Sequence, residues 1–85
     1  MINLNKLILE LEEFHEVISL PVKDNEVMIN IDDQFEITLY HDEKLNFDSF
    51  HISGEGEEMF FELNKAHGNL FILENLCDFM LEKMI

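Results

Sequence analysis

The chain has 85 residues but contains no arginine and no tryptophan, and its five cations are all lysines. Against them stand 19 Asp and Glu side chains, so the formal net charge is −14. This composition argues against nucleic acid or an anionic membrane as a direct ligand, because both are bound through clustered Lys and Arg. So many uncompensated charges repel one another in the folded state, which points to a positively charged protein partner.

Only one cysteine, Cys77, is present. This excludes an internal disulfide and a zinc site built from several cysteines. Cys77 lies in an apolar periodic segment, which predicts a small buried thiol. The first residues do not form a signal peptide, and no run reaches the ~20 apolar residues of a membrane span. We therefore expect a reducing, cytoplasmic setting.

The length predicts one domain over residues 1–85, below the usual ~100–150 residues. Such a short chain needs a dense core or a partner chain to bury enough surface. Apolar residues make up 47% of the sequence and eight of them are Phe, so the core can be filled. The chain is not a disordered acidic tail.

The first predicted element is a helix over residues 4–18, where apolar residues recur at helical spacing and glutamates take the opposite side. Asn3 is a plausible N-cap, and Pro21 forbids extension much past Ser19.

From Asn25 onward the apolar period changes to two, which predicts four short antiparallel strands. Asp32-Asp33 and Gly54-Glu55-Gly56-Glu57 are expected to form tight turns, with the two glycines supplying positive φ. Residues 41–44 are expected to form a loop. The predicted inward-facing side chains are Val27, Ile29, Ile31, Phe35, Ile37, Leu39, Phe50, Ile52, Met59, Phe61 and Leu63.

The last predicted element is a helix from Asn69, a plausible N-cap, to Ile85. It is apolar around most of its circumference, apart from a stripe at Glu74, Asp78 and Glu82. Such a helix is buried on more than one side. We therefore predict an α+β fold, a four-stranded antiparallel meander between two helices, and a homodimer formed through the C-terminal helix.

The outer face of the predicted sheet and its loops carry carboxylates together with Met28, Tyr40, His51 and Phe60. Carboxylates on a scaffold can imitate the phosphates of DNA, but a charged surface also keeps a protein soluble. The apolar outer residues fit either an interface core or packing under the second helix. The candidate partner-binding residues are Glu26, Asp32, Asp33, Glu36, Tyr40, Asp42, Glu43, Glu55, Glu57, Glu58, Phe60 and Glu62.

No arrangement of residues predicts catalysis, a metal or a cofactor. The four histidines lack zinc-binding spacing, and Asp32-Asp33 lacks the other ligands of a calcium loop. No serine sits in a nucleophile elbow, and Gly54-Glu55-Gly56 lacks the lysine of a phosphate loop. We therefore expect a binding protein rather than an enzyme.

In size and charge the chain resembles small acidic α+β inhibitors of phages and mobile elements: anti-CRISPR, anti-restriction and uracil-glycosylase-inhibitor proteins. The resemblance covers composition over the whole chain and involves no shared motif. It implies an inhibitor that occupies the basic groove of a nucleic-acid enzyme as a DNA mimic. The chain is also similar to type III secretion chaperones, although shorter, which implies an acidic dimeric chaperone or an immunity protein for a cognate effector or toxin.

Overall fold

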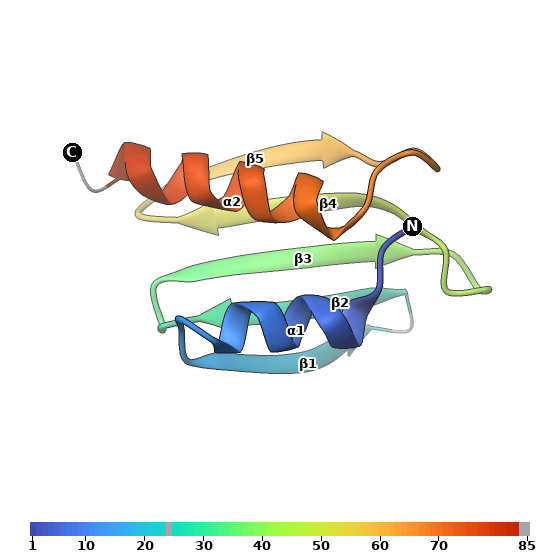
Figure 1. Cartoon of the computed structure of the whole chain (residues 1–85), viewed down its shortest axis with the longest axis horizontal. Helices are drawn as coiled ribbons and strands as arrows, with labels where there is room; N and C mark the ends of the chain where they lie inside the picture. The colour runs from blue at the N-terminus through green and yellow to red at the C-terminus, as the bar shows by residue number, and fades with distance from the viewer. Residues whose placement is uncertain (24, 84–85) are drawn as a thin grey trace.

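The computed structural model describes residues 1–23 and 25–83. One antiparallel sheet has the strand order β1-β2-β3-β4-β5 and is accompanied by two helices (Figure 1). This confirms the predicted α+β class, but the sheet has five strands where four were predicted. The elements are α1 (Leu4–Glu12), β1 (Val17–Lys23), β2 (Glu26–Ile31), β3 (Phe35–His41), β4 (Phe47–Gly54), β5 (Glu57–Glu62) and α2 (Asn69–Lys83).

The additional strand β1 comes from the end of the predicted first helix, which stops at Glu12 instead of reaching residue 18. The N–H groups of Phe14 and His15 both donate to the Leu11 carbonyl and close the helix. The chain then turns, and Val17 pairs with Ile31 of β2. The apolar spacing of the helix continues by coincidence through Phe14 and on into the strand, although Phe14 is 81% exposed.

The core lies between one face of the sheet and both helices. α1 contributes Leu7 and Leu11, and α2 contributes Ile72, Leu76 and Phe79. The ring of Phe79 meets the ring of Phe35 edge-on, with centroids 6.0 Å apart. The buried apolar residues of the sheet are Ile29, Ile31, Phe35, Ile37, Leu39, Phe50 and Ile52, all predicted to face inward. Met59 lies on the predicted inner face, opposite Ile52, but on this edge strand it is 44% exposed.

The molecule therefore has two layers, with α1 over β1 and β2 and α2 over β4 and β5 (Figure 1). The alternative in which the second helix covers the opposite face of the sheet is wrong. That opposite face, called the outer face below, is not covered by either helix.

The outward side of α2 is apolar but exposed. Cys77 is exposed, which contradicts the predicted buried thiol. At 100° per residue, position 77 lies opposite Ile72, Leu76 and Phe79, which face the sheet. Leu70 and Leu81, on the same side as Cys77, are 66% and 60% exposed. Met84 and Ile85, the end of the predicted helix, lie outside the described residues.

A reciprocal pair of asparagines joins the first turns of the two helices. The Asn3 N–H donates to Oδ1 of Asn69, and Nδ2 of Asn69 donates to the Asn3 carbonyl, both at 2.9 Å. Asn3 Oδ1 accepts the Lys6 N–H and caps α1, as predicted. Asn69 is the first residue of α2, and its side chain connects the helices.

The hairpin turn between β4 and β5 uses its glycines differently from the prediction. Positive φ occurs at Glu55 (53°) and Gly56 (80°). Gly54 serves close approach instead, because a Cβ there would overlap the ring of Phe35. The other turn behaves as predicted: Asp32 and Asp33 both have positive φ, and the Gln34 N–H donates to the Ile31 carbonyl.

Candidate protein-binding face

The register of the sheet aligns the outward side chains in rows that cross the strands. Directly opposed residues of neighbouring antiparallel strands lie on the same face. The central row runs from β1 to β5 through Leu20, Met28, Thr38, His51 and Phe60. Leu20 is 59% exposed and Phe60 is 68% exposed. The central row therefore leaves apolar and aromatic surface in contact with water.

Glutamates flank the central row on both sides. Because a strand rises about 3.3 Å per residue, the flanking rows lie roughly 13 Å apart, a spacing of the order of a groove width in B-DNA. One lysine adjoins these rows, because Lys23 pairs with Glu26 beyond the bulge in β1. One row is Ile18, Asn30, Glu36, Ser53 and Glu58, and the other is Glu26, Tyr40, Ser49 and Glu62.

An aromatic cluster forms the β3–β5 side of the outer face. The Phe60 ring stacks on His51 with centroids 4.5 Å apart and lies 6.4 Å from the ring of Tyr40. His51 Nε2 is 2.5 Å from a carboxylate oxygen of Glu58. Burial raises the pKa of the Tyr40 hydroxyl, and the charges of Glu26 and Glu58 raise that pKa further. The cluster combines flat apolar surface with carboxylates, which suits an aromatic anchor with a charged rim.

Exposed residues of β1 extend this surface and were missed from the sequence. Ile18 is 58% exposed and occupies the first position of one glutamate row, while Leu20 begins the central row. Ile18 had been assigned to the first helix, and Leu20 to no element. The signal that identifies them is the combination of β-branched Val17 and Ile18 with Pro21, which cannot sit inside a helix.

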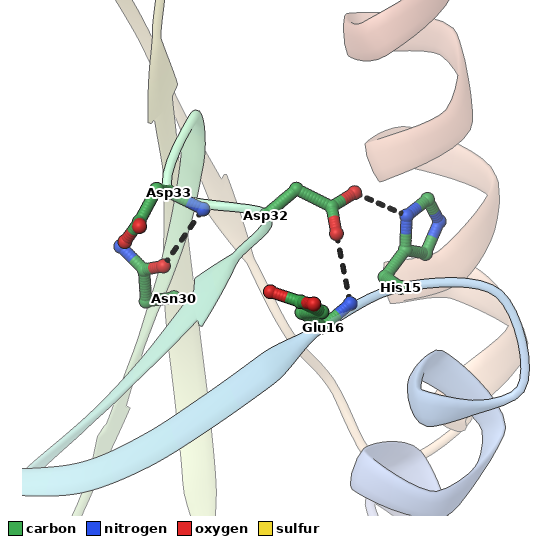
Figure 2. Close-up of polar contacts among 5 residues, drawn as sticks. All are labelled: His15, Glu16, Asn30, Asp32 and Asp33. Atoms are coloured by element: carbon green, nitrogen blue, oxygen red, sulfur yellow. Dashed lines mark hydrogen bonds and ion pairs between the residues drawn. The ribbon is translucent and has the colours of Figure 1, made fainter.

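Asp32, a candidate binding residue, is already engaged within the protein (Figure 2). Its Oδ1 accepts the Glu16 N–H at 2.8 Å, and its Oδ2 is 2.7 Å from Nδ1 of His15. The hydrogen bond from Glu16, together with the His15 contact, holds the pKa of Asp32 below its usual value. In the same turn the Asp33 N–H donates to Oδ1 of Asn30. Asp32 thus fastens the start of β1 to the end of β2.

Asp42 has a comparable structural role in the β3–β4 loop. Its carboxylate accepts the backbone N–H groups of Lys44 and Asn46, and Nδ2 of Asn46 donates to it as well. These hydrogen bonds, first of all that from the Asn46 backbone, lower the pKa of Asp42. The preceding residue, His41, was predicted to be in the loop but ends β3 and is buried.

The candidate residues do not all gather in one place. Glu26, Glu36, Tyr40, Glu58, Phe60 and Glu62 share the outer face. Glu57 belongs to the helix-facing side of β5 and forms an ion pair with Lys83 of α2. The turn residues Asp32, Asp33 and Glu55 lie at one end of the sheet, and Asp42 and Glu43 at the other.

Three of the five lysines lie where β1, β3 and β5 end. β1, β3 and β5 run in the same direction because the sheet is a meander, so they all end on one side. Lys23 ends β1, and Lys44 and Lys65 follow β3 and β5, whereas Lys83 of α2 forms an ion pair with Glu57 at the other end. Acidic turns occur at both ends of the sheet, with Asp42 and Glu43 directly beside Lys44 and with Asp32, Asp33 and Glu55 at the opposite end. The lysines therefore do not separate the sheet into a basic and an acidic end.

Within residues 1–23 and 25–83, no group of three or more His, Cys, Asp or Glu side chains is placed to hold a metal ion. Neither of the two described helices has the length and apolar content needed to cross a bilayer. Comparison with protein-family models, with curated proteins and with solved structures finds no match to this chain.

Proposed function

We propose that this protein is a small acidic inhibitor that occupies the basic nucleic-acid-binding groove of a target enzyme, as a DNA mimic of the anti-CRISPR, anti-restriction or repair-inhibitor type. The observation that carries the proposal is the uncovered outer face, where two glutamates on each side flank a central row that includes the apolar Leu20, Met28 and Phe60. A basic groove would pair with the glutamates while the central row excludes water.

Target capture tests the proposal first. The tagged protein is incubated with host lysate at low and at high salt, and the bound proteins are identified by mass spectrometry. We expect a nuclease, a repair enzyme or another DNA-binding protein that is lost as salt rises, since exposed ion pairs are screened. Duplex DNA should displace it, because DNA and the inhibitor compete for the same groove. A captured partner that DNA leaves in place would overturn the mimicry.

A pair of matched variants locates the charges responsible. Substitution of Glu36, Glu58 and Glu62 by Gln on the outer face should weaken target binding about tenfold, as expected for three ion pairs of roughly 0.5 kcal/mol each. The control removes the same number of charges from the two helices by replacing Glu12 and Glu82 with Gln and Asp78 with Asn. Equal losses for both variants would mean that only net charge matters, and the outer face would then have no special role.

A second candidate function is a chaperone or immunity protein that shields a segment of a cognate effector or toxin. The exposed apolar central row favours it. In that case Tyr40→Ala or Phe60→Ala should weaken binding more than loss of the three glutamates, and capture should resist salt. For both candidate functions we also propose a cytoplasmic location and a homodimer formed through α2.

A further inference from the structure

Strand β5 has an open edge. It is the last strand of the sheet and pairs on one side with β4. Five of its six residues are exposed, and Phe61 is half-buried. α2 lies over the helix-facing side of the sheet and leaves this edge uncovered. An open edge strand is a template for pairing with another chain.

The hydrogen-bonding pattern of the β4–β5 hairpin shows which backbone groups of β5 point towards the open edge. Gly54 and Glu57 flank the two-residue turn and form a hydrogen-bonded pair, and the Leu63 N–H donates to the Asp48 carbonyl at 2.9 Å. Residues 57, 59 and 61 therefore direct their N–H and C=O groups towards β4. The N–H and C=O groups of Glu58, Phe60 and Glu62 point away from β4, towards the open edge. The side chains of the same three residues lie on the outer face.

We propose that an extended basic segment of the partner adds to β5 as a sixth strand. This inference rests on the proposed function, because it specifies how the basic partner binds. On the outer face a segment with the pattern basic-x-apolar-x-basic would place cations opposite Glu58 and Glu62 and an apolar residue opposite Phe60. Cross-strand pairs of this kind stabilise antiparallel sheets. The apolar residue would extend the central row by one strand.

Charge argues against a second copy of the chain at this edge. In the symmetric antiparallel pairing of two β5 strands, Phe60 opposes Phe60, and Glu58 of each copy opposes Glu62 of the other. Directly opposed like charges destabilise a sheet. A basic segment turns the same two positions into attractive pairs.

The other edge of the sheet is less suited to strand addition. Its strand, β1, contains Pro21, which has no N–H, and its register shifts between Pro21 and Lys23. Prolines, bulges and lysines are features that block edge-to-edge pairing in natural sheets. β5 has none of these within Glu57–Glu62.

The test uses the full-length protein and the synthetic peptide acetyl-Ser-Lys-Thr-Val-Thr-Lys-Ser-amide. A matched peptide carries an N-methyl group on the central Val, which keeps the charge but removes the donor that would face the Phe60 carbonyl. Amide exchange is followed residue by residue by NMR. We expect the unmodified peptide to slow exchange of Glu58, Phe60 and Glu62 about tenfold or more, while residues 57, 59 and 61 change little. The N-methylated peptide should bind roughly five- to tenfold more weakly.

Two protein variants isolate the backbone contribution. Phe60→Ala and Phe60→Pro both remove the ring, and only Phe60→Pro removes the N–H on the open edge. Because that N–H faces away from β4, proline is compatible with an edge position, which circular dichroism verifies. Peptide binding should be weaker for Phe60→Pro than for Phe60→Ala.

The outcomes separate this inference from the proposed function. If the two peptides bind equally and the three amides stay unprotected, docking is by charge alone and strand addition is wrong, while the basic partner stands. If the peptide does not bind even at low salt, strand addition is also wrong, and the DNA competition described above decides the inhibitor proposal separately. If the peptide protects the three β5 amides but DNA does not displace the captured partner, strand addition is supported and DNA mimicry is wrong.

Discussion

At the scale of single residues, Asp32 connects stability to pH. Its folded pKa is depressed, so its contribution is present above the unfolded value of 3.8 and is lost as pH falls through the folded value. Asp32→Asn should therefore lower the urea midpoint at about pH 6, and should lower it less at a pH well below 3.8. Asp33→Asn, in the same turn, is the matched control and should shift the midpoint little at either pH. An equal effect of Asp32→Asn at both pH values would contradict this role.

Gly54 and Gly68 provide a second comparison at this scale. A methyl group at Gly54 would overlap the Phe35 ring and lie 2.9 Å from the Gln34 carbonyl oxygen. The nearest such atom to a methyl at Gly68 is 3.9 Å away. Gly54→Ala should reduce the free energy of unfolding by about 1–3 kcal/mol, while Gly68→Ala should change it by about 0.5 kcal/mol or less. Chemical denaturation of both variants measures the difference.

At the scale of elements, a strand or helix is predicted correctly where its apolar periodicity fits only one structure. The alternation of Ile29, Ile31, Ile37 and Leu39 with polar residues identified the central strands and their inward face correctly. It failed where one pattern fitted two structures: Ile18 continues the helical spacing of α1 but belongs to β1. The side of the sheet on which α2 lies also depends on tertiary packing, so the outer face was left with two alternatives. Which charged turns share an end of the sheet follows only from strand order.

The exposed side of α2 leads to a prediction about self-association. Leu70, Cys77 and Leu81 form an exposed stripe away from the buried side, and this stripe is apolar apart from Glu74. If this stripe joins two copies, Leu81→Glu should convert a dimer to a monomer in light scattering. Leu9→Glu, at a similarly exposed leucine of α1, should leave the mass unchanged. A wild-type monomer at all concentrations tested would contradict dimerisation through α2.

At the scale of the whole molecule, the net charge of −14 opposes self-association through α2 but favours binding of a basic partner to the outer face. Two copies of this chain repel each other, and salt screens the repulsion, so the α2 dimer should become tighter as salt rises. A basic partner is attracted to the outer face, so its affinity should fall over the same range. Light scattering and partner titration at about 0.05 M and about 0.5 M salt measure both trends. Opposite slopes would assign self-association and partner binding to separate surfaces. If partner affinity rises with salt together with dimerisation, apolar contact governs both, and the electrostatic basis of the inhibitor proposal is lost.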